Sequence, residues 1–397
     1  MARHDGPARG GFPLDLGFDY TRVYRRRSTL KGDGSDARVR ARNGENVTME
    51  RVRIGVIGTG GIVQAVHIPQ MLAHGRVDFA WCADTDAATA AKAATLAHAP
   101  VSGTDYRALL RDHPVDAVTI GTPHVAHYDA VMAALEAGVH VCCEKPLAMS
   151  VAEAEAMATE AARRGVITFV PFSYWFVPAA RLMKELIDEG ALGQLTHING
   201  YYGQGFGLTD MPMRWRFQRA IAGSGALGDL GSHLISLTYL WGGKIRRLTA
   251  HTKTFVHQRR VEGTDQMAKV DVDDDVQVIG ELESGALINL SASRTYAGRG
   301  NFQRVEVSGF KGGAVYNNSH GDELEVCLGD AWVARNQWGT LKVQPKHRLT
   351  QMQVFPNAIL EGKAPADVLP NFQIGLEVQR VMEAIEESAA SGQWVNL

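Results

Sequence analysis

An aspartate and a histidine stand four residues apart in GALGDLGSHLI, residues 225–235, a stretch otherwise made of glycine, small and apolar residues. Positions i and i+4 of a helix share one face, so Asp229 and His233 can point into one pocket. The glycines leave room for a ligand to approach the backbone. An imidazole with a pKa of about 6.5 suits proton transfer to or from a hydroxyl group during oxidation or reduction. The alternative is a satisfied pair on a core helix, with the aspartate capping it.

A lysine stands where the apolar run VHVCC ends, in the tripeptide formed by Glu144, Lys145 and Pro146. Parallel α/β sheets bind ligands at the carboxyl ends of their strands. The proline fixes φ and helps to end the strand where the lysine emerges. Lys145 can therefore donate to a reacting oxygen and stabilise its negative charge. The alternative is an ordinary surface lysine.

The stretch RIGVIGTGGIV, residues 53–63, places Gly58 and Gly60 between a strand pattern and a helix pattern. The first glycine permits a tight turn, and the second lets a pyrophosphate approach the free N–H groups of the helix. Val63 occupies the position where a third Gly or Ala is usual. A structural turn that binds no cofactor is the alternative.

The next strand pattern ends at Asp84, whose carboxylate can accept hydrogen bonds from an adenosine ribose and would repel a 2′-phosphate. No arginine follows in ADTDAAT, so NAD is favoured over NADP as the cofactor. The alternative role of Asp84 is to cap the following helix.

Strand and helix patterns alternate after residue 51, which predicts an α/β fold whose first part is a Rossmann parallel sheet. From about residue 166 longer strand patterns separated by hairpin turns predict an antiparallel or mixed sheet. A helical pattern closes the chain. The predicted divisions are an extension over 1–50, a dinucleotide-binding domain over 51–172 and a second domain over 173–397.

The composition describes an ordinary globular protein of 397 residues, with 45% hydrophobic and 21% charged residues. A formal net charge of -2 gives no case for a nucleic-acid partner, and no apolar run is long enough to span a membrane. The four cysteines predict reduced, packing side chains in a cytoplasmic protein. The acidic run VDVDDD, residues 270–275, lacks the features of a calcium loop and predicts a solvated approach to a strand, so no metal is expected.

Residues 1–50 carry no sustained helix or strand pattern and no secretory signal, which predicts a disordered extension, and Met49 is a possible alternative start.

From residue 51 to its end the chain resembles the glucose–fructose oxidoreductase/inositol dehydrogenase (Gfo/Idh/MocA) family. The resemblance rests on RIGVIGTGGI, GTPHVAH, EKPLAMS, MRWR followed by GSGALGDLGSHLISL, and the ending AIEESAASGQWVNL. It implies a Rossmann domain and, over 173–397, a substrate-binding and oligomerisation α/β domain with a large, mostly antiparallel sheet that commonly mediates contacts in a homodimer or homotetramer. It also implies that Lys145, Asp229 and His233 are catalytic. The cofactor-binding residues implied are Gly58, Thr59, Gly60, Gly61, Ile62, Asp84, Thr122, Pro123, His127, Glu144 and Lys145.

The substrate-facing candidates lie near these motifs. Trp215 and Arg216 stand where relatives commonly contact sugars, since an aromatic face packs on a ring and a guanidinium donates to hydroxyls. Relatives often carry asparagine and arginine where this chain has Ser173, Tyr174 and Trp175, which indicates a more aromatic pocket. The substrate-binding set is therefore Lys145, Tyr174, Trp175, Trp215, Arg216, Asp229 and His233. A further departure is His124, where asparagine is common after threonine–proline.

The expected function is an NAD-dependent dehydrogenase that acts on a ring hydroxyl of a sugar, a sugar derivative or a cyclic polyol. Two alternatives remain open: an NAD-dependent glycosidase on the same fold, and a non-catalytic nucleotide-binding sensor. A sensor needs neither the lysine nor the aspartate–histidine pair.

Overall fold

The computed structural model describes residues 50–365 and 368–397, and the predicted extension over 1–50 lies, except for Glu50, outside them. Its first part is a parallel six-stranded sheet in the order β3-β2-β1-β4-β5-β6. The centre of this sheet is fully buried because its strands are almost entirely apolar. The strands are β1 (Val52–Ile57), β2 (Val77–Ala83), β3 (Val101–Gly103), β4 (Ala117–Ile120), β5 (His140–Cys143) and β6 (Thr168–Phe169).

Helices connect these strands, and some of them begin at side chains that satisfy their free N–H groups. Asp86 accepts from the backbone N–H of Thr89 at the start of α3, and Ser150 accepts from that of Glu153 at the start of α6. The helices are α2 (Ile68–Leu72), α3 (Ala87–Ala97), α4 (Tyr106–Asp112), α5 (His127–Glu136) and α6 (Val151–Arg164), and a π-helical turn (Val63–His67) precedes α2.

The second part is a nine-stranded sheet in the order β16-β15-β14-β13-β7-β12-β11-β8-β17. All its neighbouring strands are antiparallel except β7 and β12, which are parallel. Its strands are β7 (Leu195–Gly203), β8 (Ile245–Lys253), β11 (Asp275–Leu282), β12 (Leu287–Ser293), β13 (Phe302–Gly309), β14 (Gly312–Asn317), β15 (Glu323–Leu328), β16 (Gly339–Lys342) and β17 (Val395–Asn396), and β9 (Gln258–Arg260) pairs with β10 (Met267–Lys269) beside it.

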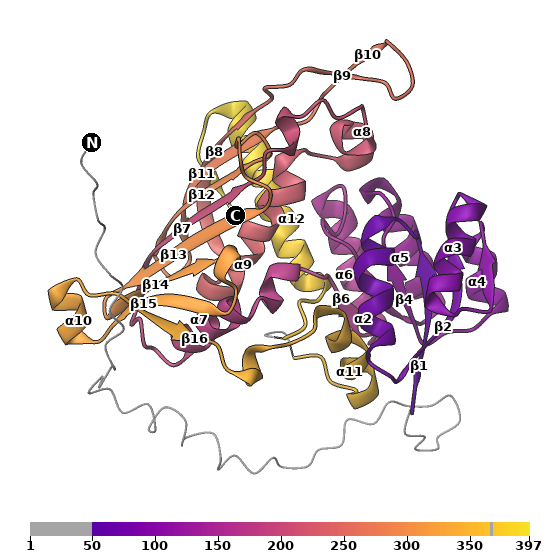
Figure 1. The fold of residues 1–397 in the computed structure, drawn as a ribbon, viewed down its shortest axis with the longest axis horizontal. Helices are drawn as coiled ribbons and strands as arrows, with labels where there is room; N and C mark the ends of the chain where they lie inside the picture. Colours follow the sequence, from indigo (N-terminus) through magenta and orange to yellow (C-terminus); the bar gives the residue numbers. More distant parts are fainter. Residues whose placement is uncertain (1–49, 366–367) are drawn as a thin grey trace, which may run out of the picture. The chain divides into compact units, whose positions relative to one another are not determined.

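Three helices pack on one face of this large sheet: α7, α9 and α12 (Figure 1). Helix α12 contacts both β8 and α6, and so joins the two parts of the chain. The opposite face carries alternating exposed residues along β11 and β12. The helices here are α7 (Pro178–Asp188), α8 (Arg219–Ala222), α9 (Ser232–Gly242), α10 (Asp330–Arg335), α11 (Val354–Glu361) and α12 (Phe372–Ser391).

The predicted fold class is confirmed, and two local expectations are corrected. Residues Leu227–Gly231 form a π-helical turn rather than the first turn of an α-helix. The run VDVDDD is not solvated throughout, because Asp273 and Asp274 are buried. No group of His, Cys, Asp or Glu within the described ranges has the arrangement of a metal site. The four cysteines are free and buried. None of the helices described here is both long enough and apolar enough to cross a bilayer.

Candidate active site

A cavity of about 850 Å³ extends along the carboxyl ends of the parallel strands and reaches the second sheet's helices. Its walls come from the glycine turn, the end of β2, the loop after β4, the segment after β5 and the stretch around α8 and α9. Thirteen of the predicted site residues line it: Gly58, Gly60, Gly61, Ile62, Asp84, Thr122, Pro123, Glu144, Lys145, Trp215, Arg216, Asp229 and His233.

The glycine turn has the form that a dinucleotide requires. Gly58 has φ of +77°, and a Cβ there would stand 2.6 Å from the side chain and backbone of Thr122. A Cβ on Gly60 or Gly61 would meet no close protein atom and would project into open space beside the cavity. The buried Thr122 Oγ1 has no partner in the described structure. The turn therefore leaves a bare backbone cradle that fits a pyrophosphate.

Asp84 is fixed beside this turn. Its Oδ2 accepts from the backbone N–H of Thr59 at 2.7 Å and from the Thr59 hydroxyl at 3.0 Å. The cap of α3 is Asp86, so Asp84 does not serve as the helix cap. Thr59 is buried and does not line the cavity itself; its two hydrogen bonds hold Asp84, which does. The Asp84 carboxylate thus stands at the cavity wall in a set orientation.

A buried histidine that the sequence reasoning missed holds Glu144. The ring of His67 lies 2.8 Å (Nδ1) from Thr119 Oγ1 and 2.9 Å (Nε2) from Glu144 Oε1. The other Glu144 oxygen accepts from the backbone N–H of Lys145 at 3.0 Å. Burial raises the pKa of the Glu144 carboxyl, but the bond and charge of His67 outweigh it and keep that pKa below its ordinary value. These contacts fix the start of the segment that carries Lys145.

The side chain of Lys145 reaches the stretch quoted at the outset. Its Nζ donates to the backbone carbonyl of Asp229 at 2.9 Å and to Asp229 Oδ1 at 3.3 Å. Arg216 Nε lies 3.9 Å from Asp229 Oδ2. Burial raises the pKa of Asp229, but the positive charges of Lys145 and Arg216 lower it to about 2. Asp229 is therefore a carboxylate that orients two cations in the cavity.

His233 lies one turn beyond Asp229 and is 6% exposed. The ring of Tyr174 packs edge-on against it at 4.8 Å between centroids, and Tyr202 lies behind at 6.1 Å. Its buried Nδ1 has no partner among the described residues. Burial lowers the pKa of His233 well below 6.5, the Lys145 charge lowers it further, and Asp229 opposes both. The imidazole is thus neutral, rather than half-protonated near neutral pH as the sequence suggested.

Asp273 holds the backbone that leads to Asp229. Its two carboxylate oxygens accept from the backbone N–H groups of Gly225 and Leu227, each at 2.7 Å. A Cβ on Gly225 would stand 1.8 Å from the Asp273 carbonyl oxygen, so only glycine fits. The neighbouring Asp274 pairs with the fully buried Arg294 at 2.7 Å. The acidic run therefore anchors the stretch that leads to Asp229.

We expect Asp273→Ala to lower the free energy of unfolding by about 2–5 kcal/mol, because it leaves two buried N–H groups unpaired. Asp273→Asn retains one acceptor oxygen and should lose less. Thermal and denaturant unfolding of the three proteins measures the difference. An alanine variant as stable as the wild type would contradict the anchoring role.

Three other predicted residues do not line the cavity. Trp175 is buried in the core, where its Nε1 donates to the Ser236 carbonyl. His127 lies beneath the cavity floor, with its ring nitrogens 3.0 and 3.1 Å from the carbonyl oxygens of Pro146 and Thr122. Tyr174 reaches the site only through its ring contact with His233; its hydroxyl bonds Tyr202 and Asn301.

Residues outside the predicted set also line the cavity, among them His124, Ser173 and Gln351. Gln351 comes from a distant segment that returns to the first domain, where its Nε2 donates to the Pro171 carbonyl. Nothing in the local sequence around Gln351 indicates this return. For His124 the signal was available, as a departure from the usual asparagine.

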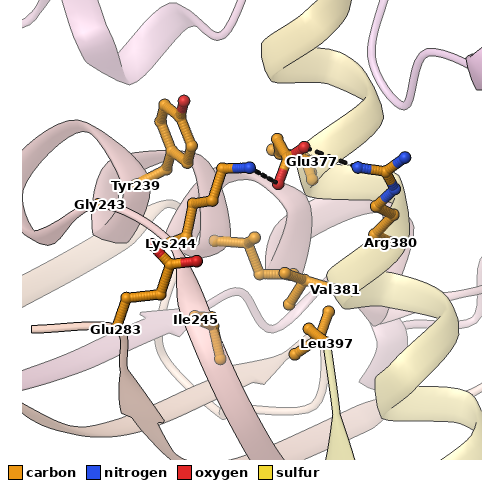
Figure 2. A pocket seen from close by; sticks show the side chains of 11 residues that line it. Tyr239, Gly243, Lys244, Ile245, Glu283, Glu377, Arg380, Val381 and Leu397 are labelled. Carbon is orange, nitrogen blue, oxygen red and sulfur yellow. Dashed lines mark hydrogen bonds and ion pairs between the residues drawn. The ribbon is translucent and has the colours of Figure 1, made fainter. Parts of the chain in front are cut away.

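A second, smaller cavity of about 130 Å³ lies between α9, β8 and α12 (Figure 2). Glu377 in its wall pairs with Lys244 at 3.2 Å and with Arg380 at 2.9 Å. Its lining contains none of the predicted site residues.

Comparisons with known proteins show to which family the chain belongs. Residues 52–172 match the "oxidoreductase family, NAD-binding Rossmann fold", and residues 180–315 match the "GFO/IDH/MocA C-terminal domain". Levoglucosan dehydrogenase of Pseudarthrobacter phenanthrenivorans is 31% identical, over 88% of this chain and 99% of its own.

Two solved structures extend the comparison. Levoglucosan dehydrogenase in complex with NADH superimposes with a TM-score of 0.82 at 31% identity, over 87% of this chain and 99% of its own. An NAD-binding oxidoreductase from Klebsiella pneumoniae has a TM-score of 0.80 at 35% identity, over 87% of this chain and 99% of its own.

Proposed function

Because the chain belongs to the GFO/IDH/MocA oxidoreductase family and has its NAD-binding Rossmann domain, we propose that it oxidises a ring hydroxyl of a sugar, a sugar derivative or a cyclic polyol with NAD⁺. One observation carries this proposal: Lys145, Asp229 and His233 line the same cavity as the glycine turn. The related levoglucosan dehydrogenase has been solved with NADH and levoglucosan, which favours a carbohydrate as the substrate.

The side chains divide the work according to their chemistry. His233, as a neutral imidazole, accepts the proton of the reacting hydroxyl and returns it in the reverse direction. Lys145 donates to the reacting oxygen and stabilises its negative charge. Asp229 holds Lys145 and Arg216 in place and accepts from a neighbouring hydroxyl. Trp215 supplies an aromatic wall, with the Arg216 guanidinium 4.5 Å from its ring centroid.

The cofactor would be held by the bare turn at Gly58, Gly60 and Gly61, with Asp84 at the ribose. When bound, NAD⁺ supplies the hydride acceptor. Glu144 lines the cavity next to Lys145 and is held in place by His67, so it shapes the cavity wall between the proposed cofactor-binding and substrate-binding parts.

The test is a panel of levoglucosan, methyl glucosides and myo-inositol, with NADH formation followed by absorbance. The proposal requires NADH formation with at least one of them, and its loss in Lys145→Met. Lys244→Met is the matched control, because Lys244 lies in the smaller cavity. Cleavage of an aryl glycoside without net NADH would instead support the glycosidase. NADH binding with no turnover of any compound would support the sensor.

The pH dependence follows from the lowered pKa of His233. The imidazole must be neutral to accept a proton, and a lowered pKa keeps it neutral to more acidic pH. We expect the acidic limb of kcat/KM to lie well below 6.5, the ordinary value of the group. The charged and titratable groups around it are Lys145, Asp229, Tyr174 and Tyr202. A limb at or above 6.5 in the pH–rate profile would contradict the assignment.

We also propose that the face of the nine-stranded sheet opposite α7, α9 and α12 joins copies of the chain into a homodimer or homotetramer. Ile279 and Leu287 are 57% and 51% exposed there, on the neighbouring strands β11 and β12. Light scattering should give a dimer or tetramer mass for the wild type. Ile279→Arg combined with Leu287→Glu should give a smaller assembly. A monomeric wild type would contradict this proposal.

A further inference from the structure

His124 connects the two parts of the chain at the cavity. It follows Pro123 in the loop after β4, and its Nδ1 lies 2.9 Å from the carbonyl oxygen of Ala222, in α8. Its ring packs edge-on against Trp215, with 5.0 Å between centroids. The side chain is 8% exposed and lines the cavity.

The contacts determine what the ring can offer a ligand. Burial, together with a smaller effect of the neighbouring His127, lowers the pKa of His124 to about 3, so the ring is neutral. Since a carbonyl oxygen only accepts, Nδ1 carries the hydrogen and donates to Ala222. Nε2 is then a pure acceptor, and it has no hydrogen-bond partner within the described part of the chain.

The position of the ring places this acceptor at the substrate end of the cavity. Trp215, which it touches, is the proposed aromatic wall. Lys145 and Asp229 line the same cavity as His124. If Lys145 and His233 hold the reacting hydroxyl, the neighbouring hydroxyls of the substrate ring would therefore lie near His124.

We propose that His124 is a specificity-determining residue that accepts a hydrogen bond, through Nε2, from a substrate hydroxyl other than the one oxidised. This inference rests on the proposed function and narrows its substrate class. A neutral acceptor favours an uncharged ring with a free hydroxyl at this point. It disfavours a phosphate or carboxylate there, because two acceptors would face each other without a hydrogen.

Two substitutions separate this role from a structural one. His124→Asn can keep a donor for the Ala222 carbonyl but lacks the acceptor at the far side of the ring. His124→Phe keeps a ring against Trp215 but has neither polar atom. His124→Gln places an amide near the position of Nε2 and should restore part of the effect. Thermal unfolding and NADH binding, measured by fluorescence, identify any variant that fails to fold.

The experiment compares kcat/KM for the best substrate of the panel with kcat/KM for each of its monodeoxy analogues. In the wild type, kcat/KM for one analogue whose reacting hydroxyl is intact should be about 10–100-fold lower than for the parent sugar, as expected for an unpaired buried polar group. In His124→Asn and His124→Phe, kcat/KM for that same analogue should be less than about threefold lower than for the parent sugar, and NADH affinity should be unchanged.

Other results would overturn the inference. If the wild type and His124→Asn discriminated against each deoxy analogue by the same factor, the residue would have a structural role only. A weakened NADH affinity in a folded His124→Asn protein would assign the ring to the cofactor instead. If the wild type formed NADH with none of the compounds in the panel, the proposed function itself would be refuted, which is a different outcome from the first two.

Discussion

Replacing His233 with alanine is expected to lower kcat for sugar oxidation by about 10²–10⁴-fold, the usual contribution of a positioned proton acceptor. The side chain lies in the cavity with Lys145 and Asp229, and its neutral form is the one that burial favours. NADH affinity should change little, because the glycine turn and Asp84 are untouched. Steady-state kinetics and fluorescence titration with NADH measure the two quantities.

The exposed His320 provides the control, and His320→Ala should retain full activity. Lys145→Met should behave like His233→Ala, since the first change removes the charge that stabilises the alkoxide and the second removes the acceptor of the hydroxyl proton. The double variant should be little worse than either single one, because residues that act as a unit are not additive. Normal turnover in folded His233→Ala would remove the histidine from the chemistry.

Replacing Asp84 with serine is expected to raise the NADP⁺/NAD⁺ ratio of kcat/KM by about 10–100-fold. A unit charge about 4 Å from another contributes about 1 kcal/mol in water and about 4 kcal/mol near a protein surface, and each 1.4 kcal/mol is about a factor of ten. Serine removes the repulsion of a 2′-phosphate and keeps an acceptor for the Thr59 N–H group. Kinetics with both cofactors give the ratio.

Asp86→Ser is the matched control for this change. Asp86 stands two residues away and caps α3 through Thr89, so its replacement leaves the charge beside the glycine turn in place. Its cofactor ratio should stay that of the wild type. If Asp84→Ser also kept the wild-type ratio, Asp84 would have no part in cofactor selection.

Much of this architecture could be predicted from local sequence. The glycine turn, the tripeptide around Lys145 and the alternating strand and helix patterns are each contained in a few consecutive residues. Their order along the chain is enough to predict a Rossmann sheet. The positions of the glycine turn and Lys145 follow directly, because carboxyl ends of parallel strands share one edge.

The remaining features depend on contacts between distant segments. Gln351 enters the cavity because Met352 and Gln353 bond to Gln70, far away in the sequence. The acidic composition of residues 270–275 predicts that Asp273 is solvated. The structure buries it because it accepts from backbone N–H groups of the stretch before Asp229, and composition does not reveal such partners.

Adjacent aromatic residues pose the same difficulty. The identity of Tyr174 and Trp175 does not indicate which one turns toward the site. In the structure Tyr174 contacts His233, while Trp175 donates to a carbonyl in the core. Similarly, the spacing of Asp229 and His233 predicted one shared pocket, but not the π-helical turn that carries the aspartate or the burial that keeps the histidine neutral.

The most direct measurement uses a sugar from the panel carrying deuterium on the oxidised ring carbon, with proton NMR of the NADH that forms. If Lys145, Asp229 and His233 catalyse direct hydride transfer from that carbon to NAD⁺, each NADH should contain one deuterium, and one sugar should be consumed for each NADH formed. NADH without deuterium, or sugar consumed without net NADH, would contradict the account.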